Sequence, residues 1–213
     1  HQSFKSVCKR SAAFGIPVAI GGVHTSNDTE RILNDIPDVQ VAFQREADLS
    51  FGEFIQIVNK NLPLNNLSQM VFNLDSSLLA IGNEHIPKAE DINTIPAWDI
   101  SNITENSKYG TIGVFRYLKP PNTRVASVLS NRGCRARCTF CSVHNFNGTG
   151  VRQRAIDSVL DEIEMLEHEY GIDHFVWLDD DLLKDEKRAI SLFNGMVQRN
   201  LSITWDASNG VVA

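Results

Sequence analysis

The sequence predicts an α/β fold that is built largely from parallel strands. Amphipathic helical stretches alternate with short, continuous apolar runs, and several of these runs end at glycine or aspartate. A continuous apolar run is typical of a strand that is buried on both faces, as strands of a parallel sheet are. Alternation of such strands with helices favours a sheet that is covered by helices, with ligands at the carboxyl ends of the strands.

The first part of the chain contains two helix and strand units. A helix over residues 4–14 precedes an apolar strand at 17–20. Asp28 can then cap a helix over 29–36, and a second strand is expected at 39–43. Further apolar residues follow at helical spacing, namely Phe51, Phe54, Ile55 and Val58.

Residues 62–123 are expected to form a linker with a small hairpin. Asn-, Ser- and Pro-containing stretches alternate there with two short apolar runs, at 70–74 and 78–81. Two apolar runs separated by turn-forming residues are typical of a hairpin. This part of the chain therefore predicts a connection rather than another domain.

A second domain is expected from residue 124. Apolar runs predict strands at 125–129, 175–178 and 203–207. Gly171 is expected to end a helix whose apolar face comprises Ile156, Val159, Leu160, Ile163, Leu166 and Tyr170. The acidic residues of this helix are expected on its solvated side, and they are Asp161, Glu162, Glu164 and Glu167.

The strongest chemical signal is a loop with three cysteines, Cys134, Cys138 and Cys141. This Cys-x3-Cys-x2-Cys spacing places three thiolates on one loop and leaves a tetrahedral centre one ligand short, as a catalytic site requires. Arginines at 132, 135 and 137 favour the thiolate, which is the form that binds metal.

The cysteines allow two other interpretations. A disulfide framework needs an oxidising compartment and a dispersed set of cysteines, whereas three are crowded here and Cys8 stands alone in an apolar helical stretch, where a buried thiol is expected. A structural zinc site could use Cys134, Cys138, Cys141 and His144. The loop follows a strand and precedes a long helix, which favours a catalytic site over a zinc finger.

The cysteine spacing resembles the signature of the radical S-adenosylmethionine (SAM) enzymes. The resemblance implies that Cys134, Cys138 and Cys141 hold three irons of a [4Fe-4S] cluster, whose fourth iron binds SAM. Phe140 lies where the family places an aromatic residue against the adenine. It also implies that SAM is cleaved to methionine and a 5′-deoxyadenosyl radical, with a reductant such as flavodoxin or ferredoxin as partner.

The segment Gly21-Gly22-Val23-His24-Thr25 resembles the Gly-Gly-x-His-x-Thr stretch of the cobalamin-binding domain that precedes many radical SAM cores. The resemblance implies that Gly21, Gly22 and Thr25 contact cobalamin. The family's Gly-Glu-x-Glu is represented by Arg45-Glu46-Ala47-Asp48, where Arg45 replaces the glycine. His24 is expected to be structural, because the Asp-x-His-x-x-Gly motif that supplies an axial imidazole is absent from this sequence. The segment 95–99 resembles the Pro-x-x-Asp segment that leads into the core.

Three aspartates, Asp179, Asp180 and Asp181, follow the strand at 175–178. Such a group needs cations or hydrogen-bond donors. The strand end resembles the second barrel strand of the family, which implies that Asp179 and Asp180 lie near the SAM amino group. Alternatively, Asp181 or a neighbour caps the next helix, whose expected apolar face is Ala189, Ile190, Phe193, Met196 and Val197.

The resemblance implies the C-terminal part of a doubly wound, Rossmann-like cobalamin-binding domain at 1–61, a linker at 62–123, and the first half of a (βα)6 TIM-type radical SAM barrel at 124–213. We therefore expect the chain, which starts at His1, to be part of a longer enzyme. The implied reaction is cobalamin-dependent methyl transfer or a related radical reaction on an unknown small molecule. A tRNA-modifying methylthiotransferase and a zinc-stabilised interaction module are the alternatives.

Composition bounds the partners. The chain has 213 residues, of which 42% are hydrophobic and 22% charged, as in an ordinary globular enzyme. A net charge of -6 argues against a dedicated nucleic-acid-binding protein. No apolar run approaches the length of a membrane span and no signal peptide is evident, so we expect no membrane insertion and a cytoplasmic location.

Overall fold

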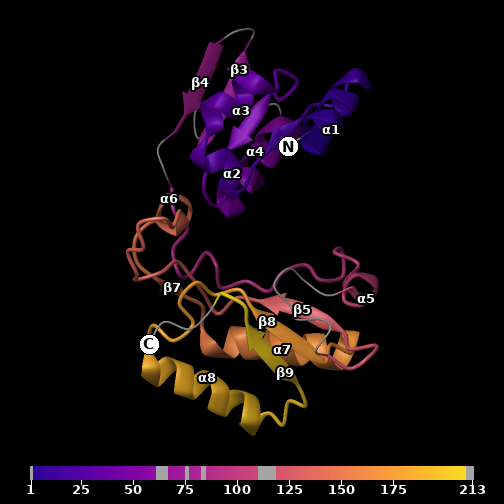
Figure 1. The fold of residues 1–213 in the computed structure, drawn as a ribbon, viewed down its shortest axis with the longest axis vertical. Helices are drawn as coiled ribbons and strands as arrows, with labels where there is room; N and C mark the ends of the chain where they lie inside the picture. Colours follow the sequence, from indigo (N-terminus) through magenta and orange to yellow (C-terminus); the bar gives the residue numbers. More distant parts are fainter. Residues whose placement is uncertain (1, 61–66, 75–76, 83–84, 110–118, 210–213) are drawn as a thin grey trace. The chain divides into compact units, whose positions relative to one another are not determined.

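The chain forms two compact units in the computed structural model (Figure 1). The first comprises residues 1–87 with 142–148, and the second comprises residues 88–141 with 149–213. Both units combine helices with strands, so the predicted α/β class is confirmed. The structure describes residues 2–60, 67–74, 77–82, 85–109 and 119–209.

The sheet of the first unit has four strands in the order β1-β2-β3-β4. β1 (Ala19–Ile20) and β2 (Val41–Phe43) run parallel, as predicted. The predicted hairpin is formed by β3 (Met70–Leu74) and β4 (Ser77–Ile81), and β3 pairs antiparallel with β2. The sheet is therefore mixed rather than all parallel, and the hairpin extends it. Parts of the expected linker lie outside the described residues, namely 62–66, 75–76, 83–84 and 110–118.

Helices pack on both faces of this sheet. On one face, Cys8 of α1 (Gln2–Ala13) and Leu33 of α3 (Thr29–Asp35) are buried in a cluster with Ala42 of β2, and Cys8 is a buried thiol as predicted. On the other face, Phe54 of α4 (Asp48–Lys60) lies edge-on against Phe43, with 5.7 Å between ring centroids. The sheet is thus covered by apolar residues on both sides.

Three details of the first unit differ from the predictions. A short helix, α2 (Val23–Asn27), precedes α3. Asp28 occupies the N-cap of α3, but its side chain makes no capping bond, because Asp28 also ends α2 and its carboxylate pairs with Arg31 at 3.5 Å. Ile55 and Val58 of α4 are exposed rather than core residues.

The second unit contains a three-stranded parallel sheet in the order β5-β8-β9. Its strands are β5 (Val125–Val128), β8 (His174–Trp177) and β9 (Thr204–Ala207), close to the predicted ranges. α7 (Ile156–Tyr170) and α8 (Glu186–Gln198) cover one face of this sheet (Figure 1). The core lies between the sheet and these helices. Short elements complete the chain, namely α5 (Ile103–Asn106), β6 (Asn131–Arg132), α6 (Val143–Asn147) and β7 (Arg152–Gln153).

The ends of the two long helices are set by individual residues. Gly171 ends α7 in the left-handed conformation with φ of 64°, as predicted. α8 is capped by Asp185, whose Oδ1 accepts a hydrogen bond from the Arg188 amide at 3.0 Å. The prediction that Asp181 or a neighbour caps this helix is therefore wrong for Asp181. The prediction of the apolar face of α8 is also wrong in part, because Ile190 and Val197 are exposed.

Glu162 is buried, although the helical pattern places it among solvated acids. Its side chain is 1% exposed, and its carboxylate lies 2.6 Å from the guanidinium of Arg154, which is 6% exposed. The indole N–H of Trp98 donates to the other carboxylate oxygen at 3.0 Å. Burial raises the pKa of Glu162, and the charge of Arg154 opposes that shift. An arginine and an indole thus make burial of this acid possible.

None of the helices in the described part of the chain combines the length and the apolar character that crossing a membrane requires.

We expect Glu162→Gln to lower the free energy of unfolding by about 3 kcal/mol, because it leaves Arg154 buried without its counter-charge. Urea unfolding followed by tryptophan fluorescence measures this loss, since Trp98, Trp177 and Trp205 all lie in the second unit. Glu169→Gln, at an exposed position of the same helix, is the control and should change stability by less than about 0.5 kcal/mol. Equal effects of the two substitutions would contradict the role given to the buried pair.

Candidate functional site: the cysteine loop and the neighbouring strand ends

The cysteine loop begins directly after β5 and is held at its start by a second pair of strands. β6 pairs antiparallel with β7, which places Asn131 opposite Gln153. Gly133 follows with φ of 93°, and a side chain there would collide with the carbonyl oxygen of Gly150. Both the dihedral angle and the lack of space require glycine at this position.

The three cysteines of the loop differ in exposure. Cys134 is half-buried, and its Sγ accepts a hydrogen bond from the Ala136 amide at 3.3 Å. Cys138 and Cys141 are exposed, and the Cys141 amide donates to the Cys138 carbonyl at 3.1 Å. All four cysteines of the chain are free thiols, so the structure does not support the disulfide alternative.

The sulfur atoms are not gathered around one point. Among the residues that the structure describes, no three His, Cys, Asp or Glu side chains are placed together so that they could hold a metal ion. The donor set nevertheless fits an iron-sulfur cluster chemically, because it offers three accessible thiols on one loop and an amide that donates to sulfur. Within the described part of the second unit, the shell of a cluster is therefore not preformed.

Asp179 lies at the end of β8 and binds the segment that leads into the loop. Its side chain is 2% exposed. The Ser130 hydroxyl donates to Asp179 Oδ1 at 2.6 Å, and the Asn131 amide donates to the same oxygen at 2.7 Å. The Ser130 amide reaches both carboxylate oxygens, at 3.1 and 3.0 Å. Burial raises the pKa of Asp179 to about 6, although these hydrogen bonds act in the opposite direction.

The two other aspartates differ from Asp179 and from each other. Asp181 is fully buried and forms an ion pair with Arg135 of the loop. Asp180 is half-buried. The expected contact of Asp179 and Asp180 with SAM stays a prediction, and the geometry assigns Asp179 a further task, which is to fix Ser130 and Asn131.

Arg188 is a residue of this site that the sequence did not reveal. Its guanidinium donates to the carbonyl oxygens of Ser130 at 3.1 Å and of Arg154 at 2.7 Å. Burial lowers its pKa, and Asp179 opposes that shift. An arginine on the first turn of an amphipathic helix looks like a solvated residue in a sequence, so no local signal could have indicated this role.

Phe140 is 91% exposed, between the two exposed cysteines. An aromatic ring that is exposed to this extent buries little apolar area and so contributes little to the stability of the fold. Its face is therefore available to a bound ligand, and the predicted contact with adenine remains compatible with its position.

The residues expected to contact cobalamin lie in the first unit, after β1. Gly21 and Gly22 are exposed, and Gly22 has φ of 95°. Thr25 is buried, and its hydroxyl donates to the Gly21 carbonyl at 3.1 Å. His24 is exposed. The two glycines thus present backbone at the surface, whereas Thr25 supports them from within.

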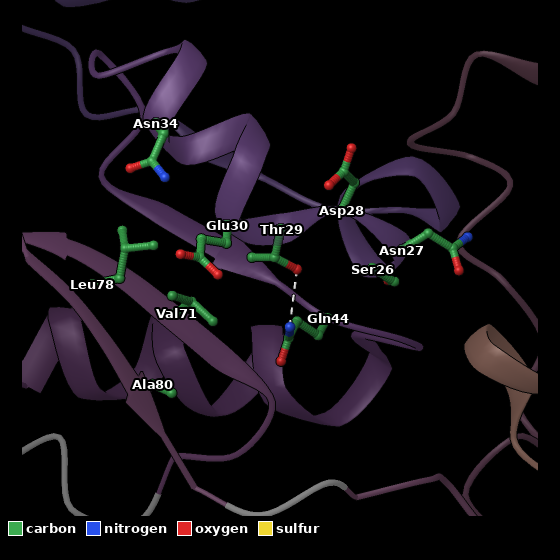
Figure 2. Close-up of a pocket in the computed structure, with 10 residues that line it drawn as sticks. All are labelled: Ser26, Asn27, Asp28, Thr29, Glu30, Asn34, Gln44, Val71, Leu78 and Ala80. Atoms are coloured by element: carbon green, nitrogen blue, oxygen red, sulfur yellow. Dashed lines mark hydrogen bonds between the residues drawn. The ribbon is translucent and has the colours of Figure 1, made fainter.

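A pocket of about 770 Å³ lies next to this segment (Figure 2). Its lining residues come from the ends of α2 and β2, from α3 and from the hairpin, and they are Ser26, Asn27, Asp28, Thr29, Glu30, Asn34, Gln44, Val71, Leu78 and Ala80. Gln44 donates to the Thr29 hydroxyl at 2.9 Å across it (Figure 2). Gly21, Gly22 and Thr25 do not line the pocket. Two lining residues nevertheless contact this segment, because the Ser26 hydroxyl donates to the Gly22 carbonyl and the Thr29 hydroxyl donates to the Thr25 carbonyl.

Arg45 stands where the family motif has glycine, and its backbone adopts a conformation typical of glycine. It has φ of 59°, in the left-handed region that favours glycine, and its amide donates to the Ser26 hydroxyl at 2.7 Å. The backbone therefore keeps the conformation that a glycine would adopt, at a cost of roughly 1 kcal/mol for the arginine.

We expect the stability that Asp179 contributes to fall as the pH rises through about 6. The folded state holds the Asp179 proton more tightly than the unfolded chain, whose pKa is near 3.8, so ionisation favours unfolding. The difference in unfolding free energy between wild type and Asp179→Asn should shrink by roughly 1.5 kcal/mol between pH 5 and pH 7.5. Urea unfolding at both pH values measures it, and a difference that is constant or grows with pH would contradict this assignment.

The chain is similar in sequence to methyltransferases and to a cyclase. No protein-family model matches the chain. An uncharacterized methyltransferase of Pyrococcus horikoshii is 26% identical and matches 91% of this chain. The cytidylyl-2-hydroxyethylphosphonate methyltransferase of Streptomyces wedmorensis is 28% identical and matches 90%. The anaerobic magnesium-protoporphyrin IX monomethyl ester cyclase of Cereibacter sphaeroides is 26% identical and also matches 90%. The chain spans 40%, 39% and 30% of the length of these relatives.

Solved structures agree with this similarity. The radical SAM methyltransferase TsrM from Kitasatospora setae, solved with tryptophan and a SAM analogue, superposes with a TM-score of 0.68 over 92% of this chain and 36% of TsrM, at 16% identity. The cobalamin-dependent radical SAM enzyme OxsB, with aqua-cobalamin and SAM bound, gives 0.71 over 96% of this chain and 28% of OxsB, at 18% identity. The resemblance drawn from the motifs is confirmed, because the chain shares the fold of cobalamin-dependent radical SAM enzymes.

Proposed function

We propose that this chain carries the cofactor-binding part of a radical SAM enzyme of the cobalamin-dependent type. The observation that carries the proposal is the cysteine loop, which presents accessible thiols after a parallel strand and is held there by buried carboxylates. That arrangement occurs in a chain that shares its fold with TsrM and OxsB. The reaction is methyl transfer or a related radical reaction on a small molecule.

Cys134, Cys138 and Cys141 would hold a [4Fe-4S] cluster. When bound and reduced, the cluster supplies the electron that cleaves SAM into methionine and a 5′-deoxyadenosyl radical. Cys134 is half-buried and already receives an amide hydrogen bond, whereas Cys138 and Cys141 are exposed and can approach it. Phe140 offers its exposed ring to the adenine, and the half-buried Asp180 would contact the SAM amino group.

Cobalamin would bind the first unit at the segment after β1. Gly21 and Gly22 expose backbone that allows close approach of a bulky ligand, and Thr25 fixes that backbone through its bond to the Gly21 carbonyl. The neighbouring pocket adds polar side chains, among them Gln44. TsrM and OxsB have both been solved with cobalamin bound, which supports the same ligand here.

The organisation expected from the sequence forms part of the proposal. Residues 1–61 would belong to a Rossmann-like cobalamin-binding domain, and residues 124–213 to the first half of a TIM-type barrel. The parallel order β5-β8-β9 supports the second assignment. A flavodoxin or ferredoxin would supply the electron. No feature of the described residues favours the methylthiotransferase or the zinc-stabilised module.

We expect the complete protein to bind about four irons per chain after anaerobic reconstitution with iron and sulfide, with broad brown absorbance. Cys138→Ala should lose this absorbance, because the loop then offers only two thiolates. His144→Ala should keep it, because His144 is no ligand of the proposed cluster. Metal analysis with a visible spectrum measures all three proteins. A colourless protein that retains one zinc, and loses it in His144→Ala, would overturn the proposal in favour of the zinc module.

A further inference from the structure

We propose that Asp181 is a positioning residue that fixes Cys134 by holding its neighbour Arg135. This inference rests on the proposed function, since it assigns Cys134 the part of a preplaced cluster ligand. Asp181 itself would touch neither cofactor nor substrate. Its task is to set the conformation of the loop on which the three cysteines lie.

The contacts between Asp181 and Arg135 involve both backbone and side chain. The Arg135 amide donates to Asp181 Oδ2 at 3.2 Å, and Arg135 Nε lies 3.1 Å from the same oxygen. A single carboxylate oxygen therefore fixes the peptide that follows Cys134 and also the direction of the Arg135 side chain.

The turn that follows Asp181 makes further hydrogen bonds to the loop, before and after Cys134. The Lys184 amide donates to the Asp181 carbonyl at 3.2 Å, and the Lys184 carbonyl accepts from Arg135 Nη1 at 3.4 Å. The Asp181 carbonyl also accepts from Asn131 Nδ2 at 3.0 Å. The loop is thus tied to one turn at Asn131 and at Arg135, on both sides of Cys134.

Burial makes this contact strong. Asp181 is fully buried, whereas the Arg135 side chain is 39% exposed. A buried carboxylate without a counter-charge destabilises the folded state, so the fold favours the loop conformation in which Arg135 contacts Asp181. The Oδ1 atom of Asp181 is buried and has no hydrogen-bond partner among the described residues, which leaves Oδ2 as the atom that carries the contact.

The chain supplies a matched control on the same loop. Arg137 is exposed, lies two residues after Arg135 and carries the same charge. No ion pair of Arg137 occurs among the described residues, in contrast to the pair of Arg135 with Asp181. Neutralising either arginine changes the loop charge equally, so only the anchoring contact separates the two substitutions.

The first experiment uses the complete protein without a cluster. We expect Arg135→Gln and Asp181→Asn each to raise the rate of trypsin cleavage after Arg137 at least about fivefold, because the loop is released. Arg137→Gln removes that cleavage site and confirms its assignment by mass spectrometry. Cleavage at the wild-type rate in both variants would overturn the positioning role, whether or not the protein binds iron.

The second experiment uses the reconstituted protein and has two readouts. The first is the rate at which a chelator removes iron, and the second is the electron paramagnetic resonance spectrum of the reduced cluster. We expect Arg135→Gln to lose iron at least about fivefold faster than Arg137→Gln and to show an altered spectrum. The double variant Arg135→Gln/Asp181→Asn removes both charges of the pair, so that no unpaired charge is left buried, and it should recover thermal stability but not iron retention. Recovery of both properties, or equal iron loss in the two arginine variants, would overturn the inference. A wild-type protein that takes up no iron would instead overturn the proposed function.

Discussion

Two buried carboxylates at the end of β8 hold the beginning of the cysteine loop, and the candidate site depends on them. A buried carboxylate is unfavourable unless it accepts hydrogen bonds or pairs with a cation. Asp179 accepts hydrogen bonds from Ser130 and Asn131, and Asp181 pairs with Arg135. Because these donors belong to the loop, the cost of burying the two acids is met only when the loop adopts this conformation. The end of the parallel sheet thereby fixes the first part of the cysteine loop.

The loop consequently has two parts with different properties. From Ser130 to Arg135 it is tied to β7, to Asp179 and to Asp181, and Gly133 leaves room for the close approach of Gly150. From Cys138 to Cys141 it is exposed and carries Phe140 at the surface. A fixed first thiol followed by two exposed thiols suits the proposed cluster, which would be inserted after folding. The same division separates residues that position the loop from residues that are proposed to contact SAM.

Much of the fold could be predicted from the sequence because it depends on local pattern. The apolar runs located β5, β8 and β9, and Gly171 located the end of α7. The cysteine loop was evident from spacing alone. The antiparallel pairing of the hairpin with β2 was not, because a hairpin pattern says nothing about which edge it joins.

The failures within the site share one physical cause, which is that burial of a charge is decided by distant partners. Glu162 has helical neighbours that predict a solvated face, yet Arg154 and Trp98 make its burial possible. Asp181 looked like a helix cap, and its actual partner, Arg135, lies 46 residues away in the sequence. Arg188 likewise acts on Ser130 from another element. Periodicity carries no information on such pairs.

The most direct test of the central claim is to mix the anaerobically reconstituted complete protein with SAM and a strong reductant, and to quantify 5′-deoxyadenosine and methionine. We expect both products to form in equal amounts, to depend on the reductant and to disappear in Cys134→Ala. A protein that holds its four irons but leaves SAM intact under these conditions, or a Cys134→Ala variant that still cleaves SAM, would contradict the proposed function.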